Sequence, residues 1–320
     1  MNKRSKTGRK LMAATQTTVG REVIRFVGLF LVIMVFVIWT KGKILNTANL
    51  KNIWKQSVFL LIGGAGAVFV MAQGHLNFSI GGVIALSGMC FGVFGAIHPW
   101  MAVPAALLVG VLCELLLVYG HIALKVPPFI VSFAIMFLTR GILSGFTQKT
   151  QVVLPRAFRA WNTPNLYYFI AIAVLVVAFI IFERTKIGKY GKALGSNYDA
   201  AVASGVKANK FKVIAYAICG VTCGICGCLQ IIRGGGISGG TGSGLETEIL
   251  IAMVLGGIPL SGGTKVRMTG ILAGALMLSV LENGMTVVGL DSDLTGLVKG
   301  IVFLCAVAVS YDRKPEQIIT

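Results

Sequence analysis

The sequence predicts an all-α, polytopic membrane protein. Of its 320 residues, 56% are hydrophobic and only 12% are charged, whereas about a quarter of the residues in a soluble globular protein are charged. A transmembrane helix needs about 20 mostly apolar residues, and many segments of this chain approach that length. We therefore expect one membrane domain over residues 26–310, flanked by short tails at 1–25 and 311–320.

We expect about ten transmembrane helices, within a range of eight to ten. They are predicted at residues 26–39, 53–71, 80–97, 101–119, 129–146, a segment ending at 182, 213–232, 245–258, 268–281 and 294–309. With ten spans, both tails and most of the Lys and Arg residues fall on the same side. Because cytoplasmic loops carry the excess of Lys and Arg, both termini are expected in the cytoplasm.

The positive charge is explained by this topology. A net charge of +18 is also typical of proteins that bind nucleic acid, but here the basic residues collect in the loops of one side. We therefore expect membrane lipid, and no nucleic acid, as a partner. The basic tail is expected to be retained, because the apolar run begins only near Phe26 and no small-residue cleavage site follows it.

The first two predicted spans differ in length and in the contacts that their residues allow. Arg25 and Lys41 can extend toward the headgroups from the short first span, and the glycines of GGAGA (63–67) allow a neighbouring helix to approach the second span closely. The polar sequence QGHLNFSIGG (73–82) then interrupts the apolar pattern. Irregular polar backbone is tolerated near membrane depth where it is buried in protein or lines a cavity.

This polar interruption is the first candidate site, a pathway for a neutral, hydroxylated solute. Amide and aromatic side chains can bind such a solute through hydrogen bonds and stacking, although they can equally well satisfy the backbone at a helix break. The pathway residues we propose from the sequence are Gln73, His75, Asn77, Phe78, Ser79, Glu114, Phe133 and Glu246.

Carboxylates inside membrane spans are costly and indicate function by default. Glu114 is expected to pair with Arg140 or Lys299, and its alternative role is an ion relay. Glu246 has a structural alternative, since a carboxylate near a helix N-terminus is stabilising by up to about 1 kcal/mol. Residues 81–88 and 256–263 (GGVIALSG and GGIPLSGG) are a weak candidate for an inverted repeat around the polar segment 183–212.

Metal and nucleotide sites are not expected in this chain. Cys219, Cys223 and Cys226 share one face of an apolar helix, where cysteine packs well. His98 and His121 are interpreted as interfacial residues and lack metal-ligand spacing. The chain contains no G-x-x-x-x-G-K-[ST] sequence, so ATP is expected to bind a partner subunit, and no catalytic constellation indicates an enzyme.

The longest polar segment inside the apolar chain, residues 183–212, is the second candidate site, and we call it the coupling segment. It carries seven Lys or Arg residues against two acids, and its centre, GSNYDAAVASGV (195–206), predicts a short helix followed by a turn at Gly205. Ser196 or Asn197 is suited to cap that helix. The alternative is a solvated basic loop that only fixes topology.

The sequence IGKYGKALGSNYDAAVASGVKANKFK (187–212) resembles the cytoplasmic loop of permease subunits in sugar-type ABC importers, the ribose, xylose and galactose permease group. The resemblance continues through residues 74–89, 126–142, 240–263 and 281–290. One departure is Asn77, where this family commonly has Asp. The residues at positions that match the family are Gly195, Asn197, Ala200, Ala201, Ser204 and Gly205; together with Asp199 they are the predicted ATPase-coupling residues.

The resemblance implies an importer subunit in a bacterial inner membrane. Its implied partners are an ABC ATPase, an extracytoplasmic solute-binding protein and a second permease subunit, identical or different. A sugar is the expected solute. The alternatives are a nucleoside or branched-chain amino-acid permease and, outside this class, an ion-coupled transporter that uses Glu114.

Overall fold

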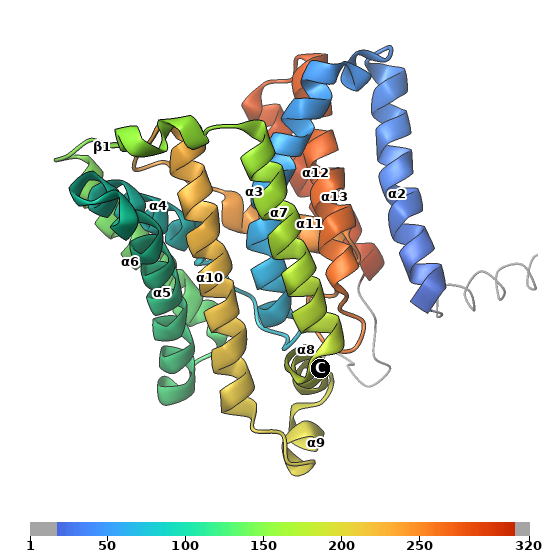
Figure 1. The fold of residues 1–320 in the computed structure, drawn as a ribbon. Helices are drawn as coiled ribbons and strands as arrows, with labels where there is room; N and C mark the ends of the chain where they lie inside the picture. The colour runs from blue at the N-terminus through green and yellow to red at the C-terminus, as the bar shows by residue number, and fades with distance from the viewer. Residues whose placement is uncertain (1–17, 311–320) are drawn as a thin grey trace, which may run out of the picture.

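The computed structural model describes residues 18–310 as a bundle of helices. The long elements are α2 (Thr18–Trp39), α3 (Thr47–Met71), α4 (Ile80–Ile97), α5 (Ala102–Leu124), α6 (Pro128–Thr147), α7 (Pro164–Phe179), α10 (Ala208–Gly234), α12 (Met268–Val288) and α13 (Ser292–Ser310). Figure 1 shows these helices running side by side, with α8 (Lys186–Ser196) and α9 (Tyr198–Ala203) at one end. The tails at 1–17 and 311–320 lie outside the described residues.

The helices agree with the prediction of a polytopic all-α protein. By length and composition, seven of the described helices can cross a membrane, and the apolar parts of α2 and α13 are shorter. Each expected span coincides with a helix. The exception in length is α11 (Leu245–Leu255), whose 11 residues extend only about 16 Å at 1.5 Å per residue. It is therefore too short to cross the apolar core by itself, contrary to the span expected at 245–258.

Small antiparallel pairing interrupts the all-helical pattern at the end opposite α9. The strand β1 (Val152–Val153) pairs with β2 (Gly236–Ile237), and the loop that contains β1 also forms a 3-10 helix at Arg156–Trp161. These segments join the long loop before α7 to the end of α10. Figure 1 shows them on the far side of the bundle from α8 and α9.

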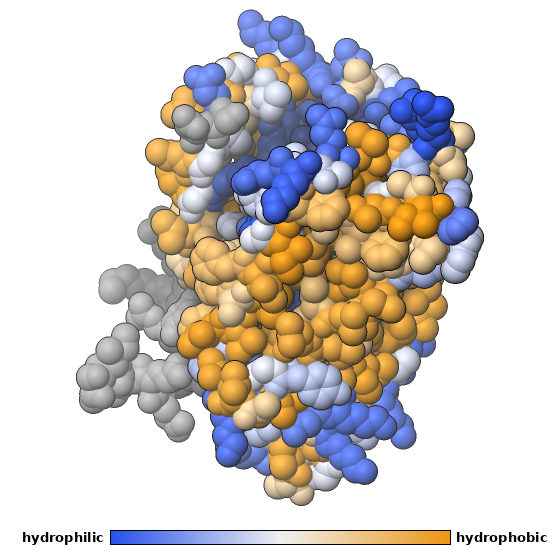
Figure 2. All heavy atoms as spheres, turned by 90° about the vertical axis from the view of Figure 1, so that its left-hand side faces the viewer, coloured by the Kyte–Doolittle hydropathy of each residue, from blue (hydrophilic) through white to orange (hydrophobic). Residues whose placement is uncertain are grey.

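Burial divides the bundle into central and peripheral helices. Within its apolar window, α3 is 83% buried, whereas α6 and α7 are each only 22% buried. Figure 2 shows the side formed by α5 and α6 as a broad hydrophobic belt with hydrophilic ends. Leu112, Leu116 and Phe137 are among its exposed side chains. Such a belt is what a surface facing lipid or another membrane subunit requires.

Glycines permit a close helix contact between α5 and α10. A Cβ atom on Gly220 would lie 2.6 Å from the carbonyl oxygen of Gly110, and one on Gly224 would lie 2.8 Å from the Cα of Leu107. Close backbone approach through small residues is a main source of helix association in membranes. The glycines of α10 therefore hold the helix that leaves the coupling segment against α5.

The candidate repeat differs in conformation between its two copies. Residues 81–88 are helical within α4, whereas residues 256–263 form turns after α11. The turns at residues 256–263 contact the segment before α4 rather than α4 itself, since Gly263 N–H donates to the carbonyl of Ala72 at 2.9 Å. The inverted repeat stays a prediction.

We predict that Gly220→Ala destabilises the protein by about 1–3 kcal/mol, the usual cost of inserting a carbon into a packed core. The new Cβ meets backbone atoms, which cannot rotate away as a side chain can. Gly141→Ala in α6 is the matched control, because nothing lies within 4 Å of its Cβ position. Thermal unfolding in detergent measures both; equal melting temperatures for the two variants would contradict the prediction.

Candidate functional site

Residues 72–79 form a polar break between α3 and α4, and its centre contacts the fully buried Glu114 of α5. The side-chain amide of Asn77 donates to both carboxylate oxygens of Glu114, at 3.0 and 2.8 Å. The hydroxyl of Ser79 lies 3.0 Å from Glu114 Oε1 and 2.7 Å from Asn77 Oδ1. Asn77 Oδ1 also accepts from the Ser79 backbone N–H at 2.9 Å. Neutral donors from the polar break therefore hold the buried carboxyl group.

The expected ion pairs of Glu114 are wrong. Arg140 and Lys299 contact other groups, and Glu114 forms no ion pair with any residue between 18 and 310. Lys299 of α13 instead lies 2.8 Å from Glu248 and 2.5 Å from Glu282. A buried carboxyl group must be hydrogen-bonded. The amide of Asn77 therefore takes the place at Glu114 that a cation was expected to fill.

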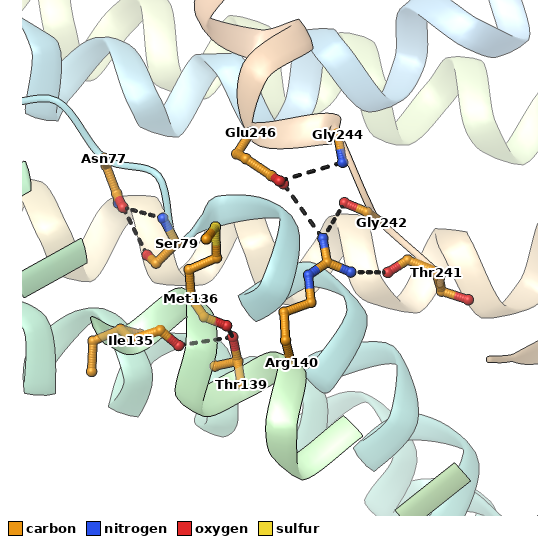
Figure 3. A network of polar contacts seen from close by, with 10 residues as sticks. All are labelled: Asn77, Ser79, Ile135, Met136, Thr139, Arg140, Thr241, Gly242, Gly244 and Glu246. Atoms are coloured by element: carbon orange, nitrogen blue, oxygen red, sulfur yellow. Dashed lines mark hydrogen bonds and ion pairs between the residues drawn. The ribbon is translucent and has the colours of Figure 1, made fainter. Parts of the chain in front are cut away.

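Arg140 of α6 holds the glycine-rich loop that precedes α11. Its guanidinium donates to the carbonyls of Thr241 and Gly242 at 2.6 Å each and lies 3.5 Å from Glu246 Oε2. Glu246 also accepts from the backbone N–H of Gly244 at 3.3 Å. Figure 3 shows these contacts between α6 and the start of α11. The structural alternative for Glu246, a carboxylate at a helix N-terminus, agrees with this geometry.

An aromatic pair joins the polar break to α6. The rings of Phe78 and Phe133 stack at 4.6 Å with an interplanar angle of 13°, and the Phe78 backbone N–H donates to the hydroxyl of the buried Ser132 at 3.2 Å. Phe133 keeps 38% of its surface exposed. Among the predicted pathway residues, Phe133 is therefore the one whose side chain is exposed.

His75, three residues before Phe78 in the polar break, packs against His121 and Tyr216. Its ring contacts the ring of His121 edge-on at 5.1 Å, and its Nδ1 lies 3.4 Å from the hydroxyl of Tyr216. His75 therefore joins the polar break to α5 and α10.

His121, interpreted from the sequence as an interfacial residue, lies in the last turn of α5 and is partly buried. Its Nδ1 lies 2.7 Å from the carbonyl of Val126 and its Nε2 lies 3.0 Å from Lys212 Nζ. Nearby, Gln73 donates to the carbonyl of Phe211 at 3.1 Å. Both contacts join the region of the polar break to the first turn of α10.

The cysteine helix packs as predicted. Cys219, Cys223 and Cys226 are fully buried in α10. The thiols of Cys219 and Cys223 and a carboxylate oxygen of Glu114 lie within 4.8 Å of one another. Asn77 and Ser79 already bind the Glu114 oxygens, so this geometry does not favour a metal over packing.

In the coupling segment, the predicted short helix and its cap are present. Asn197 Oδ1 accepts from the Ala200 N–H at 3.0 Å and begins α9, and Gly205 follows α9 with a φ of +85°. Ala201 faces inward and is 6% exposed. The sequence left the cap open between Ser196 and Asn197, and the structure assigns it to Asn197.

One face of α9 remains free of contacts with the bundle. Asp199 and Val202 are exposed, and Val202 is 43% exposed despite being apolar. Ala200 and Ser204 are also exposed, and the Ser204 hydroxyl donates back to the Ala200 carbonyl at 2.8 Å. We call Asp199, Ala200, Val202 and Ser204 the outer face of α9.

The coupling segment is fixed to the polar break through α8. A Cβ atom on Gly195 would meet the carbonyl of Ala72 and lie 2.8 Å from the backbone nitrogen of Gly263. The Ser196 hydroxyl accepts from the Thr264 N–H at 3.0 Å. Only glycine permits this approach, so Gly195, which the sequence placed among the coupling residues, contacts the bundle.

Glu183 anchors the start of the coupling segment and was missed by the sequence reasoning. Its carboxylate lies 2.7 Å from Lys192 Nζ and 3.7 Å from Arg267, and it accepts from the Met268 N–H at 3.2 Å. Lys192 also lies 4.4 Å above the ring of Phe182. These contacts tie α8 to the ends of α7 and α12.

A multi-pass helical bundle with an irregular polar break and an extramembrane helix pair is typical of membrane transport proteins. Residues 49–307 match the family described as branched-chain amino acid transport system / permease component. The match covers most of the chain, so the chain belongs to this family. The resemblance to ABC permease subunits is thereby confirmed.

Several curated proteins are similar over nearly their full length. The ribose import permease protein RbsC of Escherichia coli (strain K12) is 32% identical over 283 residues, which cover 84% of this chain and 86% of RbsC. RbsC of Bacillus subtilis (strain 168) is 30% identical, covering 90% and 92%. The galactose/methyl galactoside import permease protein MglC of Escherichia coli (strain K12) is 27% identical, covering 89% and 93%. No solved structure matches this chain.

We predict that Asn77→Asp destabilises the protein at pH 7.5, because two carboxylates would then face each other where an amide now donates. The lost charge-assisted hydrogen bond is worth about 1.5–3 kcal/mol, and repulsion adds to that loss. Lowering the pH to 5 should restore part of the melting temperature, since the two groups can then share a proton.

The double variant Asn77→Asp/Glu114→Gln exchanges the amide and the carboxylate and should also recover stability at pH 7.5. Thermal unfolding in detergent at both pH values measures all three proteins. A double variant no more stable than Asn77→Asp would show that the contact between the two side chains is unimportant.

Proposed function

We propose that this protein is the permease subunit of an ABC importer that translocates a sugar or a sugar-like solute. The observation that carries the proposal is the docking of α8 on the polar break, through Gly195 and Ala72. This contact places a helix pair suited to an external partner directly against the candidate solute pathway. The sugar-import names of its relatives favour the solute class.

The outer face of α9 would bind the ATPase. It presents an apolar side chain, Val202, beside a carboxylate, Asp199, and both are exposed. Closure of the ATPase pair on ATP would push α9 and, through α8, shift the polar break. The permease itself would perform no bond chemistry, and ATP would bind only to the partner.

The remaining partners follow from the family resemblance. Two permease subunits, identical or different, would form the pathway, and an extracytoplasmic binding protein would deliver the solute at the end that carries β1 and β2. Lipid would surround the apolar belt of Figure 2. The protein would lie in a bacterial inner membrane with both termini in the cytoplasm, on the side of the basic coupling segment.

The pathway would run past the polar break on the side of α6. Phe78 and Phe133 provide an aromatic surface for the apolar face of a sugar ring, while Gln73, His75, Asn77, Ser79, Glu114 and Glu246 shape the polar segments behind it. Nucleosides and branched-chain amino acids stay as alternative solutes, because aromatic stacking accommodates a base and apolar contact accommodates an aliphatic side chain.

We predict that Val202→Arg abolishes binding of the ATPase and reduces solute uptake at least tenfold, because a desolvated arginine would replace an apolar contact at the interface. The melting temperature should not change, since Val202 is exposed. Thr150→Arg, also at an exposed position but near the opposite end, is the control for ATPase binding. Co-purification with the ATPase and uptake by whole cells are measured; wild-type values for Val202→Arg would reject the docking role.

We predict that Phe133→Ala lowers uptake of ribose, fructose or galactose, whichever is transported, while ATPase binding is retained. Loss of one stacking surface typically costs about 0.5–1.5 kcal/mol, or about three- to tenfold in apparent affinity. Phe137→Ala, also exposed on α6 but without the Phe78 contact, is the control. Equal uptake by the two variants would place the pathway elsewhere.

A further inference from the structure

Lys212, in the first turn of α10, lies between α9 and the interior of the bundle. Its ammonium group is 5.1 Å from the ring centre of Tyr198 in α9 and 3.0 Å from Nε2 of His121 in α5. Among residues 18–310, no carboxylate forms an ion pair with Lys212. An aromatic ring and an imidazole nitrogen therefore hold this charge, and one of the two belongs to α9.

The hydrogen bonds of His121 give its ring a defined proton arrangement. Its Nδ1 lies 2.7 Å from the carbonyl of Val126, which can only accept, so Nδ1 carries the hydrogen. Nε2 is then a free acceptor and receives a hydrogen bond from the Lys212 ammonium. A neutral His121 is thus oriented by Lys212 from one side and by the backbone after α5 from the other.

The oriented ring of His121 in turn contacts the polar break. It meets the ring of His75 edge-on, with centres 5.1 Å apart and an angle of 73° between planes. His75 is two residues from Asn77, whose side chain holds Glu114. One continuous series of contacts therefore connects α9, through Lys212 and His121, to the segment that lines the candidate pathway.

We infer that Lys212 and His121 are positioning residues that transmit displacement of α9 to the polar break. When α9 moves, the Tyr198 ring leaves the ammonium, which then turns toward solvent because no carboxylate retains it. His121 loses its donor and releases His75. This path is separate from the rigid contact of Gly195 with Ala72, and it rests on the proposed function, since it requires a partner that moves α9.

The test uses the full transporter in lipid nanodiscs, with its ATPase and its binding protein. ATP hydrolysis is measured without the binding protein and then with it, in the presence of ribose, fructose or galactose. Lys212→Met, which keeps the aliphatic stem and removes the charge, should leave basal hydrolysis and ATPase binding unchanged and reduce the stimulated rate at least fivefold. Lys212→Arg, which can donate to His121 and stack on Tyr198, should restore most of it.

Lys210→Met is the matched control, because Lys210 is exposed and lies only two residues away. It should keep full stimulation. His121→Phe, which retains the ring against His75 but removes the nitrogen, should reduce stimulation, and combining it with Lys212→Met should add nothing further. Additive effects of the two changes would overturn the inference.

Two other results separate this inference from the proposed function. If the wild-type permease bound no ATPase, both would fail. If ATP hydrolysis by Lys212→Met were stimulated like that of the wild type while Val202→Arg abolished ATPase binding, only the positioning role of Lys212 and His121 would be rejected. A fall in melting temperature for Lys212→Met that Lys212→Arg does not repair would also overturn it, because it would indicate packing alone.

Discussion

The structure depends on burying a non-helical segment inside a helical membrane protein. Backbone groups within an apolar core must be hydrogen-bonded, because each unsatisfied group costs several kcal/mol. The polar break at residues 72–79 meets this requirement through its neighbours: Ser132 accepts from Phe78, and the Ala72 carbonyl accepts from Gly263. The hydrogen bonds and backbone contacts of the polar break therefore fix the relative places of α6, α8 and the turn before α12. The same contacts bring the candidate pathway and the coupling segment together.

Two kinds of contact then differ in how they respond to force. Gly195 against Ala72 and Gly220 against Gly110 are backbone contacts with no side chain to rotate. They transmit displacement rigidly. The contact between Lys212 and His121 is a single hydrogen bond between long side chains, which can break and reform at low cost. A permease that alternates between two states needs both rigid contacts, which move elements together, and contacts that can break and reform.

Much of this arrangement could be predicted from the sequence, because hydrophobic length, basic loops and turn residues are local signals. The helices, a cap at Ser196 or Asn197, the buried cysteine face and the break after α3 were all predictable. The short α11 was not, because its apolar sequence continues beyond the glycines that end the helix. The partners of Glu114 were also missed: a carboxylate and two cations suggested an ion pair, and no local pattern reveals that Asn77 reaches it from the polar break.

The contacts of His121, Lys212 and Glu183 were missed for the same reason, since they depend on which helices meet. The family resemblance indicated the coupling segment but not how it contacts the rest of the chain.

The environment of Glu114 argues against the ion-coupled alternative. A proton or sodium relay needs a carboxyl group that changes partners and is reached by water during the cycle. Glu114 is fully buried and bound by Asn77 and Ser79, which themselves belong to the polar break. Any movement that exposes Glu114 must therefore first displace the break. The proposed movement of α9 by the ATPase would supply that displacement, and the contacts of Asn77 and Ser79 with Glu114 would have to break and reform during it.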